Sequence, residues 1–165
     1  NARAMHTFTD TSGRVWSLVL NVDVIRRVRS LTSINLLDAV DGQLIERLIT
    51  DPILLCDILF AVVQPEAQQK SVSDVDFGRA LGGDVLDAAT TALLEELVDF
   101  FPSAKRELLR KALRKLRQLE EIALQTAHQK LDSPELEARM RAAIESTHGH
   151  SSGSLPASQE SLPGR

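Results

Sequence analysis

The stretch from residue 71 to residue 101, SVSDVDFGRALGGDVLDAATTALLEELVDFF, constrains the fold of this chain more than any other. Ser73 and Asp76 match the S/T-x-x-D/E pattern of a capped helix start. Gly82-Gly83 should end that short helix, because glycine tolerates the left-handed conformation that follows a helix. Asp84 should then cap a longer amphipathic helix, which the next proline closes. The stretch therefore predicts two helices joined by a hinge, with no catalytic constellation.

The composition indicates a chain that can bury a core without disulfides. The 165 residues are 43% hydrophobic, and a domain near that size buries roughly 70% of its unfolded surface. One Trp, no Tyr and five Phe leave few stacking platforms for single-stranded nucleic acid. The net charge of −4 is too mild to predict a polyanionic or membrane partner.

The only convincing β-region lies near the N-terminus, over residues 6–21. The segments HTFTD and RVWSLVLN flank a Thr-Ser-Gly turn, and Trp16, Leu18 and Leu20 alternate on one face. Two strands alone are marginal in water. The hairpin is therefore expected to pack on the helices or to pair edge to edge with another subunit.

Helical spacing begins directly after the hairpin. Asn21 or Asp23 can cap a first helix, SINLLD (33–38) breaks the pattern, and a short helix is predicted over Gln43–Thr50. The residues expected to face inward are Val24, Ile25, Val28, Leu31, Leu44, Ile45, Leu48 and Ile49. The residues expected to face water are Arg26, Arg27 and Arg29.

Asp51-Pro52 is a strong helix start, because the carboxylate can cap and proline fits the first helical position. The helix from Pro52 to Val63 is apolar nearly all round, so it should be the central buried helix. Gln64-Pro65 is expected to end it. Cys56 lies within this helix and is expected to be a buried, inert thiol. As the single cysteine it excludes a disulfide within the chain.

A long helix is predicted from Ser103 to Leu131, followed by a modest one from Pro134 to about Thr147. At ~1.5 Å per residue the long helix would extend roughly 40 Å, more than a small core can cover. Part of its apolar face should therefore meet another subunit or a partner. That face consists of residues spaced by three and four: Leu109, Leu113, Leu116, Leu119, Ile122 and Ala123.

The predicted fold class is α+β, predominantly α-helical, with an N-terminal β-hairpin followed by a helical bundle with a long C-terminal helix. We expect a single domain over residues 5–147. Residues 1–4 have the character of an expression-tag remnant, and residues 148–165, rich in Ser, Gly and Pro, are typical of a disordered tail. No signal peptide is visible, and the longest apolar run (53–63) is too short for a membrane span. A cytoplasmic location is expected.

The titratable residues do not form a recognisable catalytic or metal site. His6 belongs to the hairpin, and His148 and His150 in the tail fall short of the three or four ligands that zinc prefers. The carboxylate pairs Glu95-Glu96 and Glu120-Glu121 are expected on solvated helix faces, because adjacent helical residues do not converge. We therefore expect no metal, no cofactor and no enzymatic activity.

The first half of the long helix is strongly basic. Over residues 105–117 it carries seven Lys or Arg residues against one Glu. Clustered cations can follow a phosphate backbone, so a small helical regulator that binds nucleic acid through residues 105–117 is the alternative function. Ion pairs between these cations and Asp87, Glu95 or Asp99, in the same chain or in a neighbouring subunit, are expected equally. The residues predicted to bind a partner are Arg106, Arg110, Leu113, Arg114, Leu116 and Arg117.

The stretch that begins at Ser71 also carries a family resemblance. SVSDVDFGRALGGD followed by VLDAATTALLEELVDFFP, with the N-terminal RVWSLVLNVDVIRRVRSLTSINLLD, resembles the tail assembly chaperones of long-tailed, siphovirus-type bacteriophages and related prophages. The resemblance covers about Val15 to Leu116 and lies in the pattern rather than in an invariant motif.

The resemblance implies a non-enzymatic protein of the bacterial host cytoplasm that coats the long tape-measure protein, keeps it soluble and brings tail-tube subunits to it. The predicted long helix with its overlong apolar face suits the binding of an amphipathic helical client. The lone hairpin and the uncovered apolar face also suggest a homo-oligomer.

Overall fold

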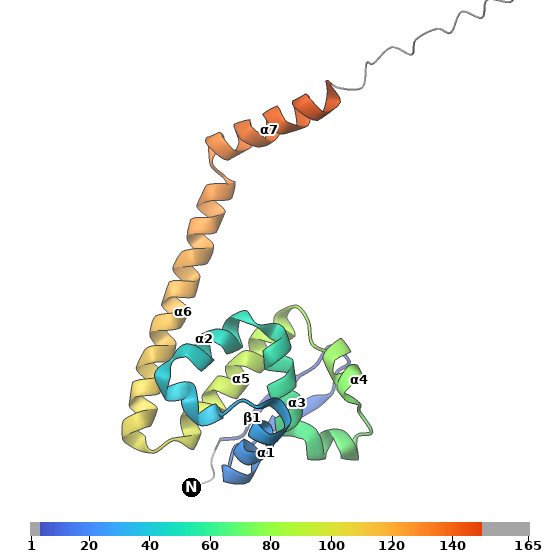
Figure 1. Ribbon diagram of the computed structural model, residues 1–165, viewed down its shortest axis with the longest axis vertical. Coiled ribbons are helices and arrows are strands. Elements are labelled where there is room, and N and C mark those ends of the chain that lie inside the picture. Colours follow the sequence, from blue (N-terminus) through green and yellow to red (C-terminus); the bar gives the residue numbers. More distant parts are fainter. Residues whose placement is uncertain (1–3, 150–165) are drawn as a thin grey trace, which may run out of the picture. The chain divides into compact units, whose positions relative to one another are not determined.

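The computed structural model describes residues 4–149 of the chain (Figure 1). Its contacts divide the chain into two compact units, Asn1–Gln118 and Leu119–Arg165. The expectation of one domain over residues 5–147 differs from this division, and the two units are described separately below. The predicted tag remnant and the predicted tail lie outside the described residues, except for Ala4, His148 and Gly149.

The fold is α+β and predominantly helical, with an N-terminal antiparallel hairpin followed by helices, one of them long, as predicted. The predicted bounds of two helices, Gln43–Thr50 and Ser103–Leu131, are confirmed. The elements are β1 His6–Thr9, β2 Val15–Leu18, α1 Val22–Thr32, the 3-10 helix η1 Leu36–Asp41, α2 Gln43–Thr50, α3 Pro52–Gln69, α4 Asp74–Arg79, α5 Asp84–Phe100, α6 Ser103–Leu131 and α7 Pro134–His148.

The hairpin packs on the helices of the first unit. β1 and β2 pair antiparallel, with His6 opposite Leu18 and Thr9 opposite Val15. The alternation predicted for β2 is confirmed, because Trp16 and Leu18 are fully buried while Val15 is exposed. The buried face lies against α5 and α3 (Figure 1).

The turn of the hairpin is built around the buried carboxylate of Asp10. It accepts hydrogen bonds from the backbone N–H groups of Ser12 (2.9 Å) and Arg14 (3.0 Å). It also accepts from the Arg14 guanidinium (2.8 Å) and from the indole N–H of Trp16 (2.9 Å). Burial by itself raises the pKa of Asp10, but these bonds favour the charged form and hold the pKa below its ordinary value.

The ring of Phe77 on α4 joins the hairpin to the helices. It lies edge-to-face against Trp16 at 5.1 Å and against Phe8 at 6.5 Å, and it contacts Phe60 of α3 at 5.5 Å. These are favourable aromatic geometries. Phe77 is fully buried. The short capped helix thus contributes a central aromatic residue of the core.

The predicted end of α3 at Gln64-Pro65 is wrong, since the helix continues to Gln69. Proline has no N–H, so Pro65 leaves the carbonyl of Ala61 without its usual helical donor. Arg27 of α1 supplies a donor in its place. Its guanidinium donates to the carbonyl oxygens of Ala61 and Val62, both at 2.8 Å. The expectation that Arg27 faces water is therefore also wrong.

Three further expectations need correction. α4 ends at Arg79, before Gly82-Gly83. Gly83, with a φ of 56°, is itself the N-cap of α5, so Asp84 lies inside the first turn, where its charge suits the positive helix end. Leu31 at the end of α1 is 54% exposed rather than inward, because η1 turns away after Ser33, which has a left-handed backbone. The caps predicted at Asn21, Asp51 and Ser73 are confirmed.

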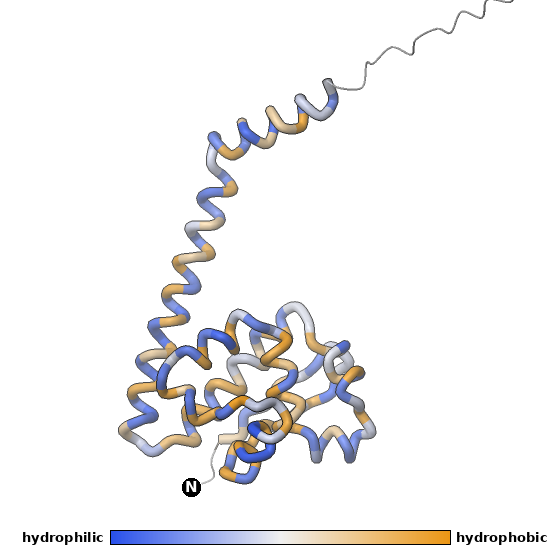
Figure 2. The backbone as a smooth tube through the Cα atoms, viewed as in Figure 1, coloured by the Kyte–Doolittle hydropathy of each residue, from blue (hydrophilic) through white to orange (hydrophobic). Residues whose placement is uncertain are grey.

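The second unit contains the C-terminal part of α6 and the whole of α7. Figure 2 shows hydrophobic positions recurring along both helices, yet no side chain of α7 is buried, and in α6 only Leu109 and Leu113, both in the first unit, are. Among the residues that the structure describes, no single helix has the length and apolarity of a membrane span. α2 and α3 meet that test only as a pair, bent by 103°.

Candidate protein-binding surfaces

The six residues predicted to bind a partner all lie on α6 within the first unit, and half of them are turned toward α5. The guanidinium of Arg106 donates to the carbonyl oxygens of Phe101 (3.1 Å) and Asp99 (3.4 Å), where it caps the negative C-terminal end of α5. Arg110 pairs with the Asp99 carboxylate at 3.2 Å. The pairing of the basic helix with Asp99, one of the two expected arrangements, thus occurs within this chain.

The remaining predicted residues divide between the core and the surface. Leu113 is buried and Leu116 is half-buried against the core. Arg117 donates to the Thr91 hydroxyl at 3.1 Å. Arg114 stays exposed. The partner-binding role of this set stays a prediction, and for Leu113 and the arginines that contact α5 the geometry favours a structural role within the chain.

Three exposed cations of α6 that donate no hydrogen bond to α5 form a narrow surface, apart from Lys105 at the start of the helix. Lys111, Arg114 and Lys115 share one helix face by their spacing of three and four. None of the three forms an ion pair within residues 4–149. A protein that follows a phosphate backbone commonly makes about 6–10 phosphate contacts. The surface offered to nucleic acid is therefore smaller than the sequence suggests.

The expectation of a solvated Glu95-Glu96 face is wrong for Glu96, which is 2% exposed. Its Oε1 accepts a hydrogen bond from the backbone N–H of Leu20 at 2.9 Å, and its Oε2 lies 2.8 Å from Nδ1 of His6. Nε2 of His6 lies 3.5 Å from Glu95 and 3.7 Å from Asp99. One buried carboxylate thus links β1, through His6, and the segment that follows β2, through Leu20, to α5.

The burial of Glu96 had a signal in the sequence. The inward positions of α5 include Ala89, Ala92, Leu93 and Leu97, and Glu96 falls between them at the same spacing of three and four. A lone carboxylate within an apolar face must find hydrogen-bond donors when it is buried. The donors come from residues 76 to 90 positions away in the chain, so the spacing could reveal the burial but not the partners.

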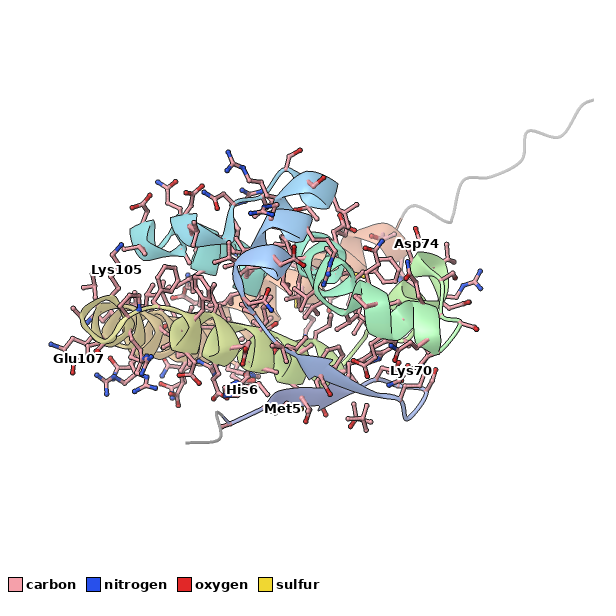
Figure 3. All side chains as sticks on the ribbon, turned by 90° about the horizontal axis from the view of Figure 1, so that it is seen from below. Met5, His6, Lys70, Asp74, Lys105 and Glu107 are labelled. Atoms are coloured by element: carbon pink, nitrogen blue, oxygen red, sulfur yellow. The ribbon has the colours of Figure 1, made fainter. Side chains whose placement is uncertain are left out.

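Two hollows adjoin along α5, and we call them together the α5 groove. The first, of about 320 Å³, is lined by His6, Glu95, Val98, Asp99, Arg110, Leu113 and Arg114. The second, of about 530 Å³, is lined by Met5, His6, Thr7, Asp87, Ala88, Thr91, Ala92 and Glu95. His6 and Glu95 line both. Figure 3 shows Met5 and His6 where the hairpin passes α5. The first hollow mixes carboxylates with arginines, whereas the second has carboxylates and a histidine.

A separate hollow of about 420 Å³ surrounds Cys56, with Leu31, Asp57 and Asp74 among its lining residues. Cys56 is half-buried rather than buried. Burial raises the pKa of its thiol, and the nearby Asp57 and Asp74 carboxylates raise the pKa further. The thiolate, which is the reactive form, is therefore disfavoured. Within residues 4–149 no group of three or more His, Cys, Asp or Glu side chains could hold a metal ion.

Six uncovered large apolar side chains lie on the two helices of the second unit, and we call them together the C-terminal apolar stripe. Its members are between 51% and 65% exposed: Leu119, Ile122, Leu124 and Leu131 of α6, and Met140 and Ile144 of α7. Every described side chain from residue 119 to residue 148 is exposed, apart from the half-buried Ser133 and Leu136. Most helical stability in proteins comes from packing of an apolar face, and these helices have no such packing here.

No protein-family model matches the chain, and comparisons with curated proteins and with solved structures find no match.

Proposed function

We propose that this chain is a non-enzymatic tail assembly chaperone of a phage or prophage, which holds an amphipathic helix of the tape-measure protein on its C-terminal apolar stripe. The observation that carries the proposal is the exposure of every large hydrophobic side chain of the stripe. In this account the chaperone keeps the tape-measure protein soluble in the host cytoplasm and helps to recruit tail-tube subunits.

The stripe has the chemistry of a helix-binding surface. An amphipathic helix binds by laying its apolar face on another apolar surface, with anchors spaced by three, four and seven residues. Full burial of one large aliphatic side chain contributes roughly 1.5–3 kcal/mol. Because these side chains are already partly buried and lie on more than one helix face, the part of the stripe that one partner helix covers supplies on the order of a few kcal/mol before the cost of ordering the partners is subtracted. This contribution is apolar and requires no catalytic chemistry.

The alternative, nucleic-acid binding through residues 105–117, has weaker support. Arg106, Arg110 and Arg117 already donate to α5, and the exposed cations that remain are Lys105, Lys111, Arg114 and Lys115. A salt-dependent shift with DNA or RNA that charge reversal at Arg114 and Lys111 abolishes would favour this alternative.

The test is co-expression with the product of the neighbouring long, helical tape-measure gene. We expect the two proteins to co-purify and the tape-measure protein to become soluble. The variant Ile122→Ser/Met140→Ser should lose co-purification. The matched control is Val22→Ser/Ile53→Ser, which replaces two side chains of the first unit that are 64% and 74% exposed, compared with 57% for both Ile122 and Met140.

The proposal fails if the tape-measure protein stays insoluble with the unchanged chain. It also fails if the control variant loses the partner as fully as the stripe variant does. A location of the gene between those for tail-tube and tape-measure proteins would support the proposal independently.

A further inference from the structure

The two outer edges of the hairpin differ in whether side chains cover them. On β2, the backbone N–H of Ser17 donates to the Glu66 carboxylate at 3.1 Å, and the Lys70 ammonium donates to the carbonyl oxygen of Val15. Figure 3 shows Lys70 beside the hairpin. Both side chains come from the end of α3 and its cap. The edge of β2 is therefore covered by side chains at two of its outward polar groups.

The edge of β1 is open. In an antiparallel pair, hydrogen-bonded residue pairs alternate with pairs whose backbone groups point outward. Ser17 and Val15 point outward, so their partners in the register, Thr7 and Thr9, also point their N–H and C=O groups away from β2. Among the described residues no group bonds to these four polar atoms. An edge of this kind is a template for strand addition.

The second hollow of the α5 groove lies beside this open edge. Its strand side consists of Met5, His6 and Thr7, its helix side belongs to α5, and no residue of β2 lines it. Met5 is 65% exposed. At about 530 Å³ the hollow has room for the side chains that an added strand would direct toward α5.

The charge of the hollow selects the side chains that fit. Asp87 and Glu95 are exposed carboxylates on its helix side, eight residues apart on α5. No Lys or Arg lines this hollow, in contrast to the first one. Opposite charge across an interface favours encounter and correct register. Lysine or arginine at alternate positions of an extended segment would face these carboxylates.

We infer that β1 takes up an extended segment of a partner protein, with lysine or arginine at alternate positions, as an added strand beside α5. Backbone bonds to Thr7 and Thr9 supply the pairing, and Asp87 with Glu95 supplies the charge selectivity. A second copy of this chain is a poorer occupant, because β1 has no Lys or Arg and two copies would bring like carboxylates together. The inference concerns a different surface from the C-terminal apolar stripe and stands without it.

The test uses the isotope-labelled full chain and a blocked peptide, acetyl-TKTKTKT-amide, followed by amide nuclear magnetic resonance. We expect the amide protons of Thr7 and Thr9 to move downfield together with resonances of residues 87–95. The acidic counterpart, acetyl-TETETET-amide, should bind at least tenfold more weakly. Asp87→Lys should weaken binding of the basic peptide about tenfold, and the matched control, Glu46→Lys at an exposed position of α2, should not.

A second variant separates the contribution of backbone hydrogen bonds to peptide binding from the contribution of charge. Thr7→Pro removes an outward N–H and no bond of the β1–β2 ladder, so the chain should keep its fold while the peptide loses most of its affinity. The inference is overturned if the basic peptide leaves Thr7 and Thr9 unmoved, if the acidic peptide binds equally well, or if these amides shift on dilution of the protein alone, which would indicate pairing with a second copy. Failure of the tape-measure co-purification would leave this result untouched.

Discussion

The two halves of α6 have the same pattern in the sequence and opposite surroundings in the structure. Leu109 and Leu113 are 1% and 9% exposed, whereas Leu119 and Ile122 are 51% and 57% exposed. The spacing of three and four residues continues across both halves. Periodicity thus predicts a helix and its apolar face, but it does not say whether the same chain covers that face.

The difference follows from what each unit can supply. In the first unit, the residues of α3 and α5 belong to one continuous core that includes Leu109 and Leu113. In the second unit, the described residues contain no core cluster at all. The first unit should therefore determine stability, and the second should determine binding. Four sets of substitutions test this contrast.

The largest effect is expected for Phe77→Ala in the core of the first unit. The ring contacts Phe8, Trp16 and Phe60, and its removal leaves a cavity between the hairpin and α3. Substitutions of this kind cost about 3–5 kcal/mol of unfolding free energy. Urea unfolding monitored by circular dichroism measures the loss. A cost below about 1 kcal/mol would contradict the central role of this ring.

Asp10→Asn should lower the unfolding free energy by about 2–3 kcal/mol, because Trp16 and Arg14 lose a charged acceptor in a buried setting. The native pKa of Asp10 is held below its unfolded value of about 4. Its stabilising contribution is therefore fully present above about pH 4 and is lost as the pH falls through the native pKa.

Unfolding measured between pH 7 and pH 2 checks this dependence. The unchanged chain should lose more stability on acidification than Asp10→Asn does. Equal losses would mean that this carboxylate does not contribute through its charge.

Arg27→Met should cost about 1–2 kcal/mol, because the carbonyls beside Pro65 lose their donors. Pro65→Ala restores a backbone N–H to the helix, so in that background Arg27→Met should cost roughly half as much. The double-mutant cycle therefore predicts a coupling of about 1 kcal/mol. Full additivity would show that Arg27 does not compensate for the proline.

Much of the fold could be predicted from the sequence, since local signals specify it. The caps at Asn21, Asp51 and Ser73 and the bounds of α2 and α6 depend on neighbouring residues, and all are confirmed.

The failures at Arg27, Pro65 and Glu96 share one cause, which is contact between residues distant in the chain. Arg27 donates to the carbonyl of Ala61, 34 positions away, which lacks its helical donor because of Pro65. His6 and Leu20 are the distant partners of the buried Glu96 carboxylate. Of the six predicted partner-binding residues, Arg106, Arg110 and Arg117 donate to α5, which no spacing along α6 could reveal.

The smallest effect on stability is expected for Ile122→Ser/Met140→Ser in the C-terminal apolar stripe. Substitutions of exposed residues usually change the unfolding free energy by less than about 0.5 kcal/mol. The melting temperature of the free chain should therefore stay within a few degrees, while co-purification of the tape-measure protein is lost. A large destabilisation of the free chain would indicate that the stripe is already covered, for example by a second copy.

Hydrogen exchange tests most directly the claim that the second unit is a binding surface without a cover of its own. In the free chain, the amides of residues 119–148 should exchange much faster than those of α3 and α5, because their helices lack packing. In the complex with the tape-measure protein, residues 119–148 should become protected while the first unit changes little. Strong protection of residues 119–148 in the free chain at low concentration, or protection on binding confined to the first unit, would contradict the account.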